Sequence, residues 1–348
     1  MIKPKPKNQD AVQLIKTQSE DCILLFTTHE NKKTAEILKN NVLIRVFVQK
    51  NGLPKDTICI GKISELKEEI GCAFLMLPGK QKCFIQLSEL KEEYNLTRPG
   101  QKCKCGDSFV VKISKEPSKN KLASAITTLK PEEEPYRQIA SSRTDYSILK
   151  NGNNYIEEAL SYFDMLTDRV NTGTCRIITD DEEVYNFLTG PENSDRFRYE
   201  IQKYEDNLVK LNVLYGLKDK ISEALSRHVW LKSGADIFID RTEALTVIDV
   251  NSGKKSGKED PDQTYLSINK EAACEICRQI VLRNLSGIIL IDFINMKNDE
   301  SKQELTAFMS DLCKTNDPKM YIIDITKLGI METTRQKTGP SLFELFDS

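Results

Sequence analysis

The sequence predicts a protein of the α/β class with several domains, in an α+β arrangement along the chain. Its 348 residues are enough for two or three hydrophobic cores. Short apolar segments separated by turn residues occupy residues 57–130, as in a small all-β domain. The last 115 residues alternate strand and helix patterns, which is typical of helices packed on a sheet.

The N-terminal half is expected to consist mainly of strands. Within residues 1–55, the apolar runs Cys22–Phe26 and Val42–Val48 predict strands, followed by a turn at Asn51-Gly52. Residues 56–130 predict a small barrel of five strands, with the OB-fold as the leading candidate. These five strands are expected at Ile58–Ile63, Cys72–Leu77, Cys83–Leu87, Phe109–Ile113 and Ala123–Leu129.

The middle of the chain mixes helices and strands. A charged, proline-containing linker begins at Lys130, and Tyr155–Leu166 has helical periodicity, so residues 131–172 form a separate segment. In residues 173–233 we expect a strand at Cys175–Ile178 and helical patterns that end near Lys220–Trp230.

The strand and helix patterns are clearest in residues 234–348. Strands are expected at Ile237–Asp240, Leu245–Asn251, Gly287–Ile294 and Met320–Asp324, and helices at Glu271–Leu285 and 300–315. Gly287 is expected to close the first of these helices. The apolar run after Gly287 is nearly continuous, which predicts a strand buried on both faces of its sheet.

Two aspartates, Asp249 and Asp292, end apolar strands that a single helix connects. Such strands lie parallel, so both aspartates should reach the same edge of the sheet. Two adjacent carboxylates stay ionised only with a cation between them, and oxygen ligands suit Mg²⁺ or Mn²⁺. Asn251 lies on the same strand face as Asp249, where its amide could orient water or a phosphate.

A strand-ending aspartate can also be only a turn former or a helix cap. We assign that role to Asp240 and Asp324. Asp249 differs from them because Asn251 and Asp292 accompany it, although pattern alone leaves both interpretations open.

Composition limits the chemistry and the location. The only histidines, His29 and His228, are expected to be partly packed structural residues, so carboxylates must carry any catalysis. The net charge of −2 means that nucleic acid would have to bind through local patches. The start lacks a signal peptide, no apolar run could span a membrane, and the ten cysteines are expected to be reduced, which together predict a cytoplasmic protein.

One aromatic residue in the predicted barrel stands out. Strand alternation places Phe84 on a polar face with Lys82 and Gln86, which favours either base stacking or ordinary core packing. Phe74 shares a face with apolar neighbours, so burial is at least as good an explanation there.

Two long segments carry a family resemblance. Ala224–Gly253 (ALSRHVWLKSGADIFIDRTEALTVIDVNSG) and Asn269–Met296 (NKEAACEICRQIVLRNLSGIILIDFINM) closely resemble the catalytic core of the ribonuclease E/G family. This match covers roughly residues 205–345. Residues 58–84 resemble the family's RNA-binding OB domain more weakly, and residues 24–50 resemble its N-terminal strands.

The resemblance implies a fold and an activity. The fold would be an RNase H-like subdomain with an inserted OB-fold barrel, followed by a 5′-sensing segment and a DNase I-like catalytic subdomain. The activity would be that of an endoribonuclease that cuts single-stranded, often A/U-rich RNA in rRNA processing or mRNA decay, with magnesium held by Asp249 and Asp292 and supported by Asn251. The family's RNA-clamping residues match Phe74, Phe84 and Lys121. Its 5′-monophosphate-reading pair matches Arg143-Thr144.

The chain departs from the family pattern in three places. Asn295 replaces a second acid, the segment between Leu129 and Arg143 is short, and the sequence to Ser348 lacks the Cys-Pro-x-Cys that shares zinc between subunits. We therefore expect no zinc, and a homodimer, if formed, would rest on other contacts. Two other functions stay open: an RNA-binding protein or decay scaffold without catalysis, and a DNA nuclease.

Overall fold

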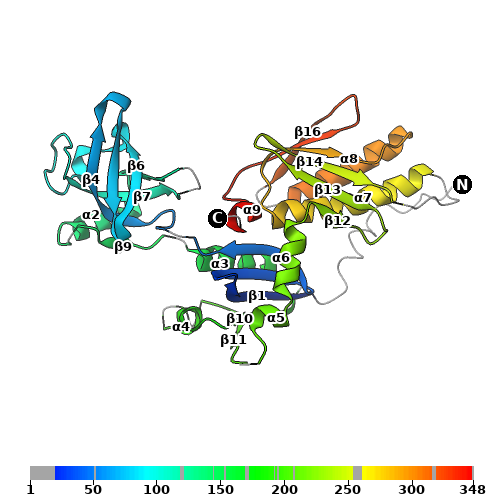
Figure 1. The fold of residues 1–348 in the computed structure, drawn as a ribbon, viewed down its shortest axis with the longest axis horizontal. Helices are drawn as coiled ribbons and strands as arrows, with labels where there is room; N and C mark the ends of the chain where they lie inside the picture. Colours follow the sequence, from blue (N-terminus) through cyan, green and yellow to red (C-terminus); the bar gives the residue numbers. More distant parts are fainter. Residues whose placement is uncertain are drawn as a thin grey trace, which may run out of the picture. The chain divides into compact units, whose positions relative to one another are not determined.

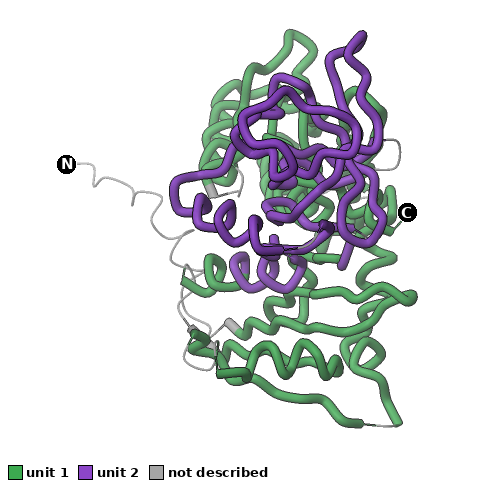
Figure 2. The backbone as a smooth tube through the Cα atoms, turned by 90° about the vertical axis from the view of Figure 1, so that its left-hand side faces the viewer, with its two compact units in different colours: residues 1–48, 163–348 green, residues 49–162 purple. Residues whose placement is uncertain are grey.

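The computed structural model describes residues 20–50, 52–117, 121–143, 145–152, 154–168, 172–191, 193, 196–206, 208–253, 261–315 and 319–346. The chain forms two compact units (Figure 2): residues 1–48 with 163–348, and residues 49–162. Among the described residues, no helix combines the length and the apolar character needed to cross a membrane.

The first unit contains a five-stranded sheet with the order β11-β10-β1-β2-β3. Figure 1 labels its strands β1, β10 and β11. Strands β1 to β3 are antiparallel, whereas β10 is parallel to both β1 and β11. The bounds are β1 Glu20–His29, β2 Lys32–Lys39, β3 Val42–Val48, β10 Thr172–Thr179 and β11 Glu200–Lys203. The predicted strands β1, β3 and β10 are confirmed, and β2 is an additional strand between them.

Helices α4 to α6 belong to the first unit, and helix α3 crosses the boundary between the two units. The bounds are α3 Tyr155–Asp168, α4 Glu182–Thr189, α5 Leu211–Leu214 and α6 Leu217–Leu225. Helix α3 confirms the helix predicted at Tyr155–Leu166. Helix α6 ends at Leu225, within the predicted range Lys220–Trp230, and His228–Trp230 forms strand β12, which was not predicted. One apolar core joins Leu25 and Val46 of this sheet to Leu282 and Leu342 from the C-terminal part of the unit.

The C-terminal part is built on a six-stranded sheet with the order β12-β13-β14-β15-β17-β16. The strands are β13 Asp236–Arg241, β14 Leu245–Asn251, β15 Gly287–Asp292, β16 Met320–Ile325 and β17 Met331–Arg335, together with β12. Helices α7 Pro261–Leu282 and α8 Asp299–Thr315 pack on one face (Figure 1), and α9 covers Leu342–Phe346. The predicted parallel pairing of β14 and β15 is confirmed.

Three details of this sheet correct the predictions. Strand β15 is covered on one face only: Ile289 and Ile291 are buried, but Ile288 is 52% exposed. Strand β17 was not predicted and lies between β15 and β16. Helix α7 begins at Pro261 and ends at Leu282, and Gly287 (φ 82°) starts β15 instead of closing the helix. Asn284 (φ 50°) takes the left-handed position after the helix.

The second unit is a closed five-stranded barrel, and all five predicted strands are confirmed. The order β5-β6-β8-β7-β4 closes through the pairing of β4 with β5, and β9 adds to β4. The bounds are β4 Ile58–Lys67, β5 Cys72–Leu77, β6 Gln81–Gln86, β7 Ser108–Lys115, β8 Ala123–Ile126, β9 Ile148–Lys150 and helix α2 Pro135–Ala140. Short 3-10 turns lie at Glu68–Ile70, Pro78–Lys80, Leu87–Glu89, Glu92–Tyr94 and Pro131–Glu133.

Candidate active site

Asp249 and Asp292 lie side by side on the open face of the six-stranded sheet. They are register partners on the parallel strands β14 and β15, and both side chains are exposed. Neighbouring strands are about 4.8 Å apart, so the two carboxylates project from adjacent positions. This is the geometry expected if one cation is to contact both groups.

The strand pattern explains why these side chains face outward. On β14, Ile248 and Val250 are buried against the helices while Asp249 and Asn251 are exposed. On β15, Ile291 is buried and the next residue, Asp292, is exposed. The apolar residues therefore fix the register, and the register determines where the carboxylates lie.

Polar contacts hold the surroundings of the pair. The Asn251 amide (Nδ2) donates a hydrogen bond to Asp249 Oδ2 at 3.0 Å, which restrains the carboxylate. The fully buried Asn269 of α7 forms two hydrogen bonds with the backbone of Ile294, two residues beyond Asp292. Its Oδ1 accepts from the Ile294 amide at 3.0 Å, and its Nδ2 donates to the Ile294 carbonyl at 2.8 Å. Asn295 is exposed in this segment. Asn269 was not singled out from the sequence, although a polar residue on the buried face of a helix was a usable signal.

The donor set fits a hard divalent cation. Two carboxylates and a nearby amide oxygen are the ligand types that Mg²⁺ and Mn²⁺ bind, with water completing the shell. The described residues contain no group of three or more His, Cys, Asp or Glu side chains that could hold a metal.

The two histidines have different environments. His29 is buried and contacts Phe346 edge-on, as expected for a packed histidine. The His228 side chain is 30% exposed, on the open face and in the same register row as the two aspartates. The sequence did not reveal this position, because strand β12 was not predicted.

In the barrel, Phe74 and Phe84 are cross-strand partners on the outer face. Their ring centroids are 6.2 Å apart with an interplanar angle of 68°, and both side chains are half-buried. The interior is filled instead by their strand neighbours Leu75 and Ile85. Lys121 is exposed just before β8, the strand that pairs with β6 at Phe84.

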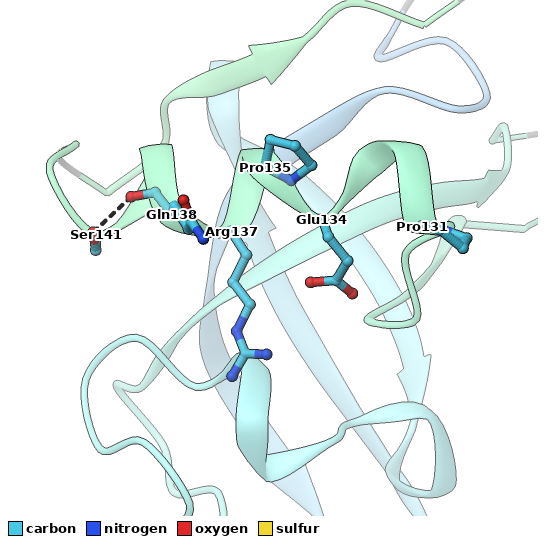
Figure 3. A pocket seen from close by; sticks show the side chains of 6 residues that line it. All are labelled: Pro131, Glu134, Pro135, Arg137, Gln138 and Ser141. Carbon is cyan, nitrogen blue, oxygen red and sulfur yellow. Dashed lines mark hydrogen bonds between the residues drawn. The ribbon is translucent and has the colours of Figure 1, made fainter.

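The segment proposed to sense a 5′ end is only partly described. Arg143 is exposed after α2, and Thr144 lies outside the described residues. A hollow along α2 has the lining Pro131, Glu134, Pro135, Arg137, Gln138 and Ser141 (Figure 3). Arg137 stacks 4.9 Å from the Tyr94 ring centroid, and the Tyr94 hydroxyl donates to Glu134 at 2.6 Å. The two charged side chains that line the hollow, Glu134 and Arg137, thus already have partners, and Arg143 is not part of the lining.

Comparison with known proteins gives the family. The sequence profile of the ribonuclease E/G family matches residues 87–338. Ribonuclease E of Synechocystis sp. is 32% identical over 234 residues, which is 64% of this chain and 32% of that protein. Ribonuclease G of Haemophilus influenzae is 38% identical over 152 residues, 44% of this chain and 30% of that protein. Ribonuclease G of Escherichia coli K12 is 38% identical over 129 residues, 37% of this chain and 26% of that protein.

The chain therefore spans about a third or less of the length of these relatives. The family match nevertheless extends over well more than half of the chain and includes both strands that carry the aspartate pair. On this basis the chain belongs to the ribonuclease E/G family.

Proposed function

We propose that this chain is an endoribonuclease that hydrolyses single-stranded RNA with a Mg²⁺ ion held by Asp249 and Asp292. The observation that supports this best is the register pairing of two exposed aspartates on adjacent parallel strands. Like charges this close are stabilised by a cation between them. The names of the relatives, ribonuclease E and ribonuclease G, agree with RNA as the substrate.

Each residue of the pair has a defined task in this proposal. Asp249 and Asp292 would hold the metal, and Asn251 would orient Asp249 through its hydrogen bond. A bound magnesium ion supplies Lewis-acid polarisation of the scissile phosphate and lowers the pKa of a coordinated water. Hydrolysis by water attack with the 3′-oxygen leaving gives 5′-phosphate and 3′-hydroxyl ends. Mn²⁺ has the same ligand preferences and is the expected substitute.

The barrel is proposed to bind the RNA. Phe74 and Phe84 would stack on bases, and Lys121 would contact a phosphate. The closed five-stranded order with a parallel β6–β8 pair supports the OB-fold assignment for residues 56–130. Half-buried rings on the outer wall support stacking more than core packing.

The remaining assignments follow the family architecture. The β11-β10-β1-β2-β3 sheet supports an RNase H-like subdomain formed by residues 1–55 and 173–233. We assign residues 131–172 to a shortened 5′-sensing segment with Arg143 and Thr144, and residues 234–348 to a DNase I-like catalytic subdomain. We also propose a cytoplasmic location, where the ten cysteines would stay reduced.

The direct test is cleavage of a labelled, single-stranded A/U-rich oligonucleotide in magnesium. We expect cleavage that EDTA abolishes and that Asp249→Asn reduces by about a thousandfold or more, because metal catalysis contributes several kcal/mol. RNA binding by this variant should be largely retained. Asp324→Asn is the matched control, since Asp324 is also exposed near the end of a strand in this sheet but lies on β16. Normal cleavage by Asp249→Asn in magnesium would show that the site is wrongly assigned.

The same assay separates the alternatives. A scaffold without catalysis would bind the oligonucleotide but leave it intact with or without EDTA, and Asn295 is the observation that favours this reading. A DNA nuclease would cut a DNA oligomer of matched sequence at least as fast as the RNA. Substrates with 5′-phosphate and 5′-hydroxyl ends, compared in parallel, would show whether Arg143 and Thr144 sense the 5′ end.

A further inference from the structure

An aromatic cluster lies in the same register row as the aspartate pair. Reading across four strands, His228 pairs with Phe238, Phe238 with Asp249, and Asp249 with Asp292. Directly paired residues share a face of the sheet, so all four side chains project from the open face. With strands about 4.8 Å apart, Phe238 is one strand from Asp249 and His228 is about 10 Å from it.

The rings in this cluster are ordered against one another. The His228 and Phe238 rings are stacked, with centroids 4.5 Å apart and an interplanar angle of 12°. Trp230 packs edge-on to His228 at 4.5 Å. His228 Nε2 lies 3.0 Å from Asp236 Oδ2, a hydrogen bond that fixes the imidazole plane. The cluster is therefore a pre-arranged surface, which lowers the entropy cost of binding a flat ligand.

Packing alone does not account for this cluster. The helices α7 and α8 cover the opposite face, and the core there is formed by Ile237, Ile239 and their neighbours. Trp230, the only tryptophan of the chain, is 69% exposed at the end of β12. An exposed tryptophan contributes little to the stability of the fold, because most of its apolar surface stays in water. A nucleobase stacked on Trp230 would bury the indole surface and its own.

An ion pair supports the rings from one side. The Arg227 guanidinium lies 5.3 Å from the Phe238 ring centroid and is paired with Asp240 at 2.5 Å and 2.7 Å. Because Asp240 already engages this guanidinium, Arg227 supports the Phe238 ring, and the surface left for a ligand is that of the rings.

We propose that Trp230, His228 and Phe238 form a base-stacking subsite that holds a nucleobase of single-stranded RNA beside the Asp249–Asp292 pair. This inference rests on the proposed function, because the same face must receive the RNA. Stacking accepts any base, so the subsite positions the strand for cleavage and contributes little to sequence choice.

The test compares Trp230→Ala with Trp230→Phe and with Tyr321→Ala. Tyr321 is an equally suitable exposed ring, 58% exposed on β16 at the far side of the sheet. We expect Trp230→Ala to lower kcat/KM for the oligonucleotide by roughly tenfold or more, the usual effect of losing one stacked base. Trp230→Phe should retain most of the activity, and Tyr321→Ala should match the wild type. Circular dichroism verifies that each variant is folded.

A second readout does not depend on cleavage. In the Asp249→Asn variant, titration with the same oligonucleotide should quench the fluorescence of the single tryptophan. A series of oligonucleotides, each with one base removed at a different position, should identify the stacked base. We expect the wild type to cut more slowly the oligonucleotide whose missing base lies near the scissile bond, and Trp230→Ala to cut all members of the series at similar rates.

The outcomes are distinguishable. If the wild type neither binds nor cuts RNA, the proposed function fails and the subsite fails with it. If the wild type cuts RNA but Trp230→Ala behaves like Tyr321→Ala and binding leaves the fluorescence unchanged, only the subsite is refuted.

Discussion

At the scale of single residues, the aspartate pair depends on neighbours that restrain it. The Asn251 amide donates a hydrogen bond to Asp249, and this bond does not extend to Asp292. The two carboxylates are thus held differently, although they occupy equivalent register positions. Groups that orient a metal ligand usually contribute less to activity than the ligand itself.

We predict that Asn251→Ala lowers the cleavage rate by about 10- to 100-fold, the usual cost of losing a group that orients a metal ligand. The magnesium concentration needed for half-maximal activity should rise as well. A magnesium titration of the cleavage rate measures both quantities. An Asn251→Ala variant with an unchanged magnesium dependence would show that the hydrogen bond to Asp249 is not needed for metal binding.

A second residue-scale prediction concerns Glu36 on β2. Complete burial, with a contribution from the negative charge of Asp180, raises the pKa of this carboxyl from 4.5 to about 8. The folded state therefore binds the proton more tightly than the unfolded state. The resulting stability is fully present below pH 4.5 and is lost as the pH rises through about 8.

We expect Glu36→Gln to raise the free energy of unfolding at pH values near 8. The gain over the wild type should grow by on the order of 1 kcal/mol per pH unit and vanish near the unfolded pKa. Urea unfolding at several pH values measures it, with Glu69→Gln as an exposed control. A difference that does not change with pH would contradict the raised pKa.

At the scale of elements, the end of α7 and the start of β15 determine where Asp292 lies. The buried Arg335 of β17 joins these elements, because its Nη1 donates to Asn284 Oδ1 at 3.0 Å and to the Leu285 carbonyl at 2.7 Å. The Leu342 amide in turn donates to the Arg283 carbonyl at 2.9 Å, which attaches α9 to the same turn. The added strand β17 is therefore part of the support for the site.

Replacing Arg335 with methionine should destabilise the first unit by about 2–4 kcal/mol, because the buried Leu285 carbonyl loses its charged donor. Chemical denaturation followed by circular dichroism measures this change. Arg143→Met, at an exposed position, should leave stability within about 0.5 kcal/mol of the wild type. Equal stabilities of the two variants would show that Arg335 does not support this turn.

At the scale of the whole molecule, the second unit is an insertion into the first. The chain leaves the first unit after Val48 and returns at Phe163. The inserted unit has its own core of residues such as Ile60, Leu75 and Phe109 in a closed barrel. A unit with a closed sheet and a separate core meets the usual conditions for independent folding.

We therefore predict that residues 49–152, expressed alone, fold and bind single-stranded RNA without cutting it. Binding should weaken by roughly 1–3 kcal/mol when Phe84 is replaced by alanine, which is the usual contribution of one stacked base. Ile70→Ala, at a 72% exposed position, is the control. Fluorescence anisotropy of a labelled oligonucleotide measures both. A folded fragment with no affinity for RNA would refute the proposed role of the barrel.

Much of the secondary structure was predictable because local patterns are strong in this chain. The five barrel strands and the strands at Cys22, Val42, Leu245 and Gly287 follow from apolar runs bounded by turn residues. Strands β2 and β17 were missed because they mix polar and apolar residues that become buried only through their neighbours, such as Glu36 and Arg335.

By itself, the sequence determined that Asp249 and Asp292 lie at or near the ends of neighbouring parallel strands, because one helix between two apolar strands permits little else. Only the tertiary structure decided which face of the sheet stays open. The apolar run of β15 looked buried on both sides, yet only one side receives helices. Placing His228, Phe238 and the aspartates in one row required the register of four strands. Register depends on contacts between segments far apart in sequence, and no local pattern contains them.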